Sequence, residues 1–352
     1  MHTKINVVIP VYRPDEKLIQ LFTMLNKQTI AVSKVIVMNT VPGSMSDNVD
    51  GRDGRAASII GECRKLCNTN LEVVHVYPEN FDHGGTRALA VSYAEDDCDY
   101  LLFMTQDAVP ENEYLVEKLL EPFISDSFAG LDESASSKIA AAYARQLPSK
   151  DSSLSECFTR GFNYPDIEAV KTAEDIEKIG IKAFFCSNVC AMYKKSVYES
   201  LGGFVKRTIF NEDMIFANKL LKKGYNIAYA SKATVIHTHN YSGKQQYKRN
   251  FDLAVSQTLN PQAFSGISSE SEGIKYVKAA FIYFIKAGKP FEIIPFGINC
   301  VYKYLGYKKG KNIADLKYDE IMKCTSNPGF FDNVRPGKDI VDRAMKVNGI
   351  SQ

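Results

Sequence analysis

From residue 4 onward, the chain alternates short apolar runs with segments of helical periodicity. Runs typical of buried strands lie at 4–11, 34–38, 71–77, 100–105 and 139–143. The intervening segments repeat apolar residues at three- and four-residue spacing, which predicts helices; the first begins after Pro14. Strands alternating with helices favour a mostly parallel sheet with helices on both faces. We therefore expect an α/β, doubly wound, Rossmann-like fold.

Beyond residue 145 the pattern is less regular. Residues 146–178 are polar, and no regular element is expected there. Residues 181–193 are apolar and predict one extended strand, in which Cys186 and Cys190 would face the same side. The expected domain is completed by a helix near 212–224 and strands near 226–230 and 233–237.

The C-terminal region, 256–352, is predicted to be helical and distinct from the α/β domain at 1–255. Between Ile274 and Lys311 there are eight Lys, nine Phe or Tyr, and one acid, Glu292. A basic, aromatic and amphipathic helix is typical of one lying on an anionic membrane surface. The alternative is that its apolar face docks on the main domain. A contact between copies of the chain is a further expected use of this region.

Composition and charge exclude several classes. The net charge of +2 gives no indication of nucleic-acid binding, and 24% charged residues is ordinary for a globular protein. The eight cysteines include no C-x-x-C pair, which favours buried thiols in a reducing compartment. No secretion signal and no apolar run of ~18 residues is present. A cytoplasmic protein is expected, with peripheral contact at the inner face of the cell membrane through 274–311.

The strongest chemical signal is the run YLLFMTQDAVP at 100–110. A buried strand that ends in Asp107 places this acid where open α/β sheets bind ligands. A lone buried carboxylate is costly, so a divalent cation on a diphosphate is its natural partner. Thr105 stands where an acid-x-acid motif would have its first acid. A simple helix cap is the alternative role for Asp107.

Two further segments follow predicted strands. Tyr12, at the tip of the first strand, can stack on a base, and Arg13 can meet a phosphate. In Asp82–Arg87, Gly84 and Gly85 allow close backbone approach, and the helix that follows favours an anion at its N-terminus. Ordinary loop residues and a structural Gly-Gly turn are the alternatives.

Two polar clusters lie later in the chain. Glu212 and Asp213 precede a predicted helix, where a carboxylate could act as a general base or simply complement the helix dipole. His237 and His239 end the last predicted strand and face the same side. A neutral imidazole there could bind Mn²⁺, or the histidines could be structural.

In this order, the motifs resemble those of the inverting, GT-A-type glycosyltransferases of family 2, and particularly the bacterial rhamnosyltransferase subgroup. The F-D-H-G-G-T-R and T-Q-D-A sequences are the most specific part, and the resemblance covers roughly residues 4–256. The matching segments are Asn80–Arg87, Leu102–Pro110, Tyr143–Pro148, Arg160–Pro165, Gly180–Asn188, Gly202–Phe204, Asn211–Asp213 and His237–Asp252, with a weaker echo at Lys303–Gly310.

The resemblance implies a dTDP-L-rhamnose donor and a role for each matching residue. Asp107 and His237 would hold Mg²⁺ or Mn²⁺, with His239 the less favoured ligand. Asp213 would be the catalytic base, with Glu212 as the fallback. The residues implied for donor binding are Pro10, Tyr12, Arg13, Asn39, Asp82, Gly84, Arg87 and Gln106. Those implied for sugar or acceptor contact are Arg145, Gln146, Asn188 and Arg249. Asn39 departs from the Asp usual in the family.

The implied reaction is a single inverting displacement, in which a carboxylate with an ordinary pKa near 4 accepts the proton of the acceptor hydroxyl. The basic aromatic C-terminal region favours an acceptor saccharide carried on a polyprenyl diphosphate, as in cell-envelope polysaccharide synthesis. A UDP-hexose donor and a non-catalytic nucleotide-sugar-binding module are the alternatives. A sugar nucleotidyltransferase is disfavoured because Gly84–Arg87 does not follow the first strand directly.

Overall fold

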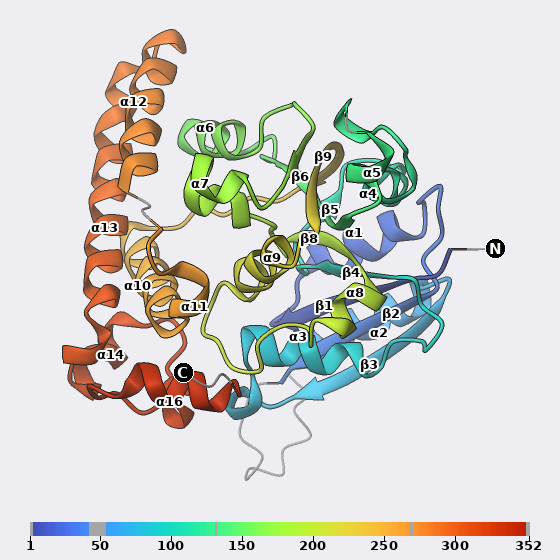
Figure 1. Cartoon of the computed structure of the whole chain (residues 1–352), viewed down its shortest axis with the longest axis horizontal. Helices are drawn as coiled ribbons and strands as arrows, with labels where there is room; N and C mark the ends of the chain where they lie inside the picture. The colour runs from blue at the N-terminus through green and yellow to red at the C-terminus, as the bar shows by residue number, and fades with distance from the viewer. Residues whose placement is uncertain (1–2, 42–53, 131, 268–269, 350–352) are drawn as a thin grey trace.

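The computed structural model describes residues 3–41, 54–130, 132–267 and 270–349. Over these ranges it forms a nine-stranded mixed sheet in the order β3-β2-β1-β4-β8-β6-β9-β5, with β7 beside β9 (Figure 1). The strands are β1 (Ile5–Tyr12), β2 (Lys34–Thr40), β3 (Asn70–Val76), β4 (Tyr100–Met104), β5 (Val109–Pro110), β6 (Ile139–Leu147), β7 (Ala169–Lys171), β8 (Cys190–Lys194) and β9 (Asn226–Ile236).

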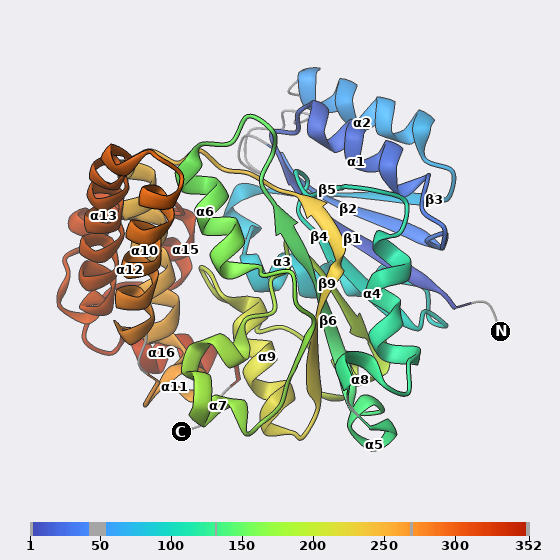
Figure 2. The ribbon, with the colours of Figure 1, turned by 90° about the horizontal axis from the view of Figure 1, so that it is seen from above.

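Helices cover both faces of this sheet and form the C-terminal region (Figure 2). They are α1 (Glu16–Leu25), α2 (Gly54–Leu66), α3 (His83–Val91), α4 (Leu115–Ile124), α5 (Glu133–Ser136), α6 (Leu154–Asn163), α7 (Asp175–Ile179), α8 (Lys195–Ser200), α9 (Glu212–Lys222), α10 (Gly243–Leu259), α11 (Pro261–Phe264), α12 (Glu270–Lys286), α13 (Ile293–Lys311), α14 (Tyr318–Cys324), α15 (Gly329–Asn333) and α16 (Ile340–Val347).

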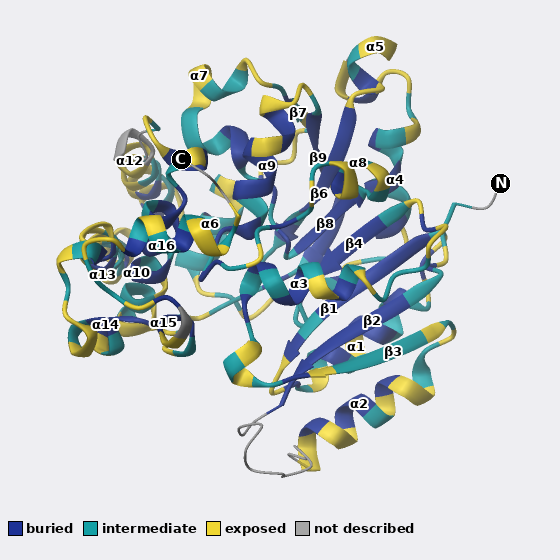
Figure 3. Cartoon of the chain, turned by 60° about the horizontal axis from the view of Figure 1, so that its bottom comes forward, coloured by how far each residue is buried: buried dark blue, intermediate teal, exposed yellow. Residues whose placement is uncertain are grey.

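The alternation of side chains along β1 shows how the two faces are filled. Val7 and Ile9 lie in one core cluster with Leu18 of α1 and residues of α2 and α4, whereas Val8 lies in the other with Phe216 of α9. A strand buried on both faces reads as a continuous apolar run, as this one does. Figure 3 shows β1, β2 and β4 buried, with β3 more exposed at the sheet edge.

The predicted α/β class is confirmed, and its parallel part is β3-β2-β1-β4. Strand β8 runs antiparallel between β4 and β6, while β6 and β9 are parallel. The carboxyl ends of β1, β4, β6 and β9 therefore face one region of the molecule. Ligands bind beyond such strand ends in open α/β sheets, so the topology itself indicates where a site should lie.

Three expectations for the second half of the sheet are wrong. Residues 146–178 are not irregular but contain α6, β7 and α7. Residues 181–193 are not one strand, because a 3₁₀ helix spans Gly180–Phe184 and only Cys190–Lys194 is extended, so Cys186 lies outside the strand. The two strands expected at 226–237 are one strand, β9, with an irregularity opposite Ala144 and Arg145. In each case, contacts with distant parts of the chain override the local sequence pattern.

The long helix α10 packs tightly along α13. A Cβ atom built on Gly306 would lie 2.1 Å from the Tyr247 carbonyl oxygen, and one on Gly310 would lie 2.4 Å from that of Phe251. Only glycine permits this backbone contact. The boundary expected at residue 255 lies inside α10, which also shares a core with α14–α16 through Phe251. In the described ranges, no helix combines the length and apolar character needed to cross a bilayer.

The glycine contact gives a stability prediction. Gly310→Ala is expected to destabilise the protein by about 1–3 kcal/mol, because the new methyl group overpacks the α10–α13 interface. Gly297→Ala is the matched control on the same helix, since a Cβ there meets no atom within 4 Å. It should be neutral, or stabilising by up to about 1 kcal/mol, through helix propensity. Urea unfolding measures both; equal effects would contradict the packing argument.

Candidate active site

A cavity of about 840 Å³ lies beyond the carboxyl ends of the strands. Its walls come from the tips of β1, β4 and β9, the start of α9, and helices α6, α10, α12 and α13. Many residues expected from the sequence line it: Pro10, Tyr12, Arg87, Gln106, Asp107, Gln146, Asn188, Glu212, Asp213, His237, His239 and Arg249. The fold thus gathers residues from segments that are far apart in the chain.

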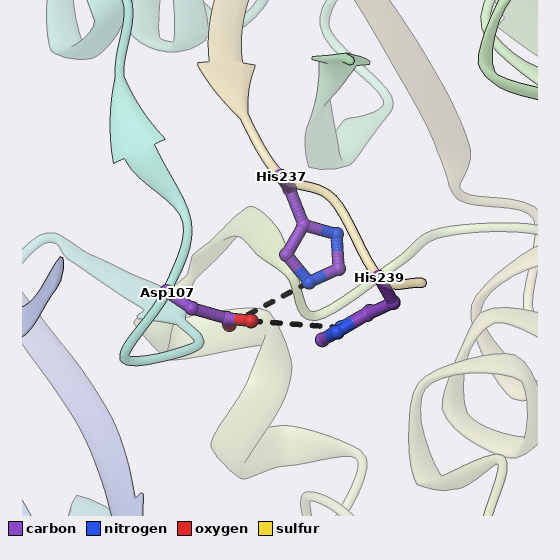
Figure 4. A group of neighbouring side chains, drawn as sticks. All are labelled: Asp107, His237 and His239. Atoms are coloured by element: carbon purple, nitrogen blue, oxygen red, sulfur yellow. Dashed lines mark ion pairs between the residues drawn. The ribbon is translucent and has the colours of Figure 1, made fainter. Parts of the chain in front are cut away.

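Asp107 and two histidines form a compact cluster in this cavity (Figure 4). Asp107 lies in the tight turn after β4, and His237 directly follows β9. The Nε2 atoms of His237 and His239 each lie 3.5 Å from a carboxylate oxygen of Asp107. One ligand atom from each residue falls within 4.8 Å of the other two. His239, expected as the weaker candidate, is as close to Asp107 as His237.

The outer contacts of His237 fix its orientation. Its Nδ1 lies 2.9 Å from Oε1 of Gln146. The amide nitrogen of Gln146 is engaged by the hydroxyl groups of Tyr164 and Ser187, and Oε1 also accepts a hydrogen bond from Arg160. This network makes Gln146 the acceptor and His237 Nδ1 the donor, which leaves the Nε2 lone pair facing Asp107. Gln146, expected at the sugar, thus supports the histidine.

The cluster has the protonation states that a cation requires. Burial lowers the pKa of His237, and it lowers that of His239 to about 3, so both imidazoles are neutral. Burial acts to raise the pKa of Asp107, but a proton taken up by His237 or His239 is attracted to its carboxylate, and the pKa of Asp107 is held below its usual range, so the carboxylate is ionised. One carboxylate and two imidazoles suit Mn²⁺ better than Mg²⁺, which prefers oxygen ligands.

Glu212 is held in a buried ion pair. One carboxylate oxygen lies 3.1 Å from Nη1 of Arg87, and both side chains are at most 7% exposed. The same oxygen accepts a hydrogen bond from the side-chain amide of Asn188 at 3.2 Å. Asn211, in the left-handed region at φ +63°, makes the turn that leads into this acidic pair. The carboxylate of Glu212 therefore has fixed partners within the protein, and these partners account for its burial.

Asp213 has a different environment. Its carboxylate accepts hydrogen bonds from the backbone N–H groups of Asn188, at 3.1 Å, and Met214, at 2.7 Å. Within the described residues it forms no ion pair. Burial, followed by repulsion from Glu212, raises the pKa of Asp213 to about 7, in contrast to the ordinary value expected from the sequence. A carboxylate tuned toward neutral pH is suited to general-base catalysis.

Tyr12 and Gln106 form the rim of the cavity on the β1 side. The side-chain amide of Gln106 binds the Tyr12 backbone twice, accepting from its N–H at 2.9 Å and donating to its carbonyl at 3.0 Å. Tyr12 is 49% exposed, which makes its ring accessible to a planar partner. Arg13 does not line the cavity; its guanidinium lies 5.1 Å from the centre of the Tyr12 ring.

The structure does not bring Asp82 or Gly84 to the cavity, contrary to expectation. Asp82 caps α3 by accepting from the N–H groups of Gly84 and Gly85, and it also accepts from Thr208 N–H. The helix N-terminus expected to bind phosphate is therefore filled by this carboxylate, whose pKa is raised by burial to about 6. A Cβ on Gly84 would lie 2.2 Å from the Val205 carbonyl oxygen, so this glycine is needed for close packing against the backbone at Val205 and not for contact with a ligand.

Asn39 and Arg145 also lie outside the cavity wall. Asn39 is buried at the end of β2, where its amide nitrogen lies 3.2 Å from Nδ1 of His75. Arg145 donates to the carbonyl of Tyr164 and pairs with Asp166 at 2.6 Å. Both side chains are thus held by protein partners rather than directed at a ligand.

Several cavity residues were missed from the sequence. Phe81 and Phe210 flank His83 of the F-D-H-G-G-T-R motif, and the three rings form an aromatic wall with successive ring centres 5.4 and 5.6 Å apart. Lys303 of α13 reaches the opposite side, beside Arg249 of α10. Neither cation makes an ion pair or hydrogen bond within the described residues; their contacts are with aromatic rings. Only the basic character of 274–311 and the echo at 303–310 could have indicated Lys303.

Comparison with known proteins assigns the chain to a family. The model of glycosyl transferase family 2 matches residues 6–202. The chain belongs to this family. Among its relatives is the O-antigen chain rhamnosyltransferase RfbN of Salmonella typhimurium, which is 33% identical over 335 residues, covering 94% of this chain and 97% of the relative. WbaN of Salmonella anatum, described in the same words, is 31% identical and covers 94% of this chain and 96% of the relative.

The glycosyltransferase also resembles solved structures in its fold. The mannosyltransferase PcManGT of Pyrobaculum calidifontis, solved with GDP-Man and Mn²⁺, has a TM-score of 0.54 at 11% identity. The match covers 90% of this chain and 87% of that one. At this identity the likeness concerns the fold alone, and it agrees with the GT-A architecture of the sheet and its covering helices.

Proposed function

We propose that this glycosyltransferase transfers L-rhamnose from dTDP-L-rhamnose, with inversion, to a hydroxyl group of a lipid-linked saccharide. The observation that carries the proposal is the convergence of two groups on one cavity: the acids Glu212 and Asp213, and the cluster of Asp107, His237 and His239. The first can accept a proton and the second can hold a divalent cation. The names of the two Salmonella relatives support rhamnose as the transferred sugar.

Asp107, His237 and His239 would hold Mn²⁺ or Mg²⁺. Bound there, the ion supplies electrostatic stabilisation of the charge that develops on the departing diphosphate. PcManGT was solved in complex with Mn²⁺, which supports a divalent cation for this chain as well. Gln146 would act behind the site by holding His237 in the tautomer that a ligand needs.

The chain's own groups have separate tasks in this proposal. The exposed ring of Tyr12 would stack on the thymine base, with Gln106 holding its backbone in place. Arg87, kept in position by Glu212, would face the donor sugar. Asp213 would take the proton of the acceptor hydroxyl as this oxygen attacks the anomeric carbon from the side opposite the diphosphate. A single displacement of this kind inverts the anomeric configuration.

The test begins with ligand binding. A thermal-shift panel of dTDP-rhamnose, UDP-glucose and other nucleotide sugars, each with Mn²⁺, should show the largest rise in melting temperature for dTDP-rhamnose, since a ligand that binds only the native state stabilises it. Radiolabelled transfer to a lipid-linked acceptor follows. If only a UDP-hexose stabilises the protein and is transferred, the donor is that nucleotide sugar and not dTDP-rhamnose. Binding without any turnover, across a range of acceptors, would favour a binding module instead.

The unpaired cations of the cavity give a prediction about the acceptor. If the acceptor carries a diphosphate, Lys303→Ala should raise the KM for the acceptor by about tenfold or more, since hydrogen bonds to charged groups contribute roughly 1.5–3 kcal/mol. Hydrolysis of the donor in the absence of acceptor should not change. Lys27→Ala, an exposed lysine outside the cavity, is the control. An equal rise in both variants would remove Lys303 from acceptor binding.

A further inference from the structure

Exposed apolar side chains are concentrated on one part of the molecule. Most of the large apolar residues that are exposed in the described ranges lie on α12, α13 and the turn between them. They are Ile274, Val277, Phe281, Ile282, Ile285, Phe291, Ile294, Ile298, Val301, Tyr302, Tyr304 and Leu305. Phe291, in the turn, is 82% exposed. Such a concentration of exposed apolar side chains on two neighbouring helices of a globular protein marks an interaction site.

The two faces of α12 differ in what they contact. The inner face carries Ala280 and Phe284, which pack with Phe158 of α6 and Phe296 of α13. The outer face carries Ile274, Phe281, Ile285 and their neighbours at three- and four-residue spacing. The sequence left two alternatives for this helix: docking on the main domain or facing a partner. The structure assigns the first to the inner face and leaves the outer face open for the second. Figures 1 and 2 place α12 and α13 together at the edge of the molecule, away from the strands.

The charges on this surface have one sign. Lys278, Lys286 and Lys289 are exposed on the outer side of α12 and the following turn, and they make no ion pair within the described residues. Lys308 and Lys311 are exposed near the end of α13. Glu292 is the one acid between Ile274 and Lys311. A partner that covers this surface must therefore present apolar groups together with negative charge.

We propose that the outer faces of α12 and α13 dock on an anionic lipid surface. Acyl chains would cover the apolar stripe, and lipid phosphates would lie against the lysines. A second copy of the chain fits less well, because a two-fold contact through the same patch would place the lysines of both copies against each other. The inference adds a partner to the proposed function and does not depend on the identity of the donor sugar.

The same helices join this surface to the cavity. Tyr276 of α12 and Phe296, Asn299 and Lys303 of α13 line the cavity from their inner sides. A lipid surface against the outer sides therefore lies one helix layer away from the site. Docking would hold the cavity at the level where the saccharide of a lipid-linked acceptor meets the head groups.

Co-sedimentation of the full chain with vesicles tests the proposal. Vesicles of phosphatidylcholine with phosphatidylglycerol should bind the protein, pure phosphatidylcholine should bind it weakly, and added salt should weaken binding. Each of Lys278→Gln and Lys289→Gln should reduce the partition coefficient about fivefold. The double variant Phe281→Ser and Ile285→Ser should reduce it by on the order of tenfold or more. Matched controls outside the patch are Lys27→Gln and Ile124→Ser.

The readouts separate this inference from the proposed function. Absence of binding to phosphatidylglycerol vesicles at low salt overturns the inference, as does an equal loss in patch and control variants. A dimer in analytical ultracentrifugation that dissociates in the Phe281→Ser and Ile285→Ser variant also overturns it, in favour of a second copy. Transfer to a water-soluble acceptor should be unchanged in the patch variants. If the wild-type protein binds vesicles but transfers no sugar, the proposed function is wrong and the inference of lipid docking stands.

Discussion

Replacing Asp213 with Asn is expected to reduce glycosyl transfer by about 10²–10⁴-fold while donor binding persists. The reason is that Asp213 is the acid in the cavity without a cationic partner, and its raised pKa equips it to accept a proton. Steady-state transfer rates and titration of the donor measure the two effects. Glu212→Gln should behave differently, because it leaves Arg87 without its buried partner and so weakens donor binding and stability as well. Substantial turnover in Asp213→Asn would remove this residue as the base.

The same pKa predicts how pH acts. Because Asp213 must be ionised to act as a base, kcat should fall as the pH drops below about 7, with an apparent pKa that belongs to the Glu212–Asp213 pair. For stability the sign is opposite: a folded-state pKa above the unfolded value means that the native state binds more protons. Asp213 therefore lowers stability as the pH rises from about 4 to about 7, and Asp213→Asn should stabilise the protein at neutral pH by about 1–4 kcal/mol.

The second large effect concerns Asp107. Asp107→Ala should lower the affinity for Mn²⁺, measured calorimetrically in the presence of dTDP, by more than about a hundredfold and should abolish transfer, because it removes the one charged group of the cluster. Gln146→Ala should have a smaller effect, about 10–100-fold in metal affinity, through the loss of support for His237. His75→Ala, an exposed histidine outside the cavity, is the control. Unchanged Mn²⁺ affinity in Asp107→Ala would place the metal elsewhere.

The sequence indicated the cavity residues best where they lie at the ends of regular elements. Asp107, His237 and the Glu212–Asp213 pair each adjoin a strand or helix whose apolar pattern is local and strong. Parallel strands present their carboxyl ends on one side, so residues at the tips of β1, β4, β6 and β9 converge whatever the intervening loops do. That rule places Asp107 and His237 in one site, whereas the Glu212–Asp213 pair, at the start of α9, is brought there only by the packing of that helix.

The errors have a different origin, since each concerns a side chain whose partner lies far away in sequence. Asp82 was expected at the donor, but its carboxylate is engaged by Thr208, more than a hundred positions later. Gln146 lines the cavity and stays a candidate for sugar contact, but its support of His237 has no signal in the sequence. The helix α6 was missed because its short amphipathic pattern gains its burial only from α12 and α13, through Phe158. Such long-range pairs leave no periodic signal in the chain.

The sequence by itself determined the α/β class, the family resemblance, and the acids and histidines with which the chemistry is proposed, because these are written in local patterns and short motifs. The tertiary structure decided which of two adjacent acids lacks a cationic partner, and it placed His239 as near to Asp107 as His237. It also decided that α12 and α13 line the cavity with one face and expose the other. The physical reason is burial: the folded surroundings of a group, rather than its neighbours in the chain, set its charge, its partners and its accessibility.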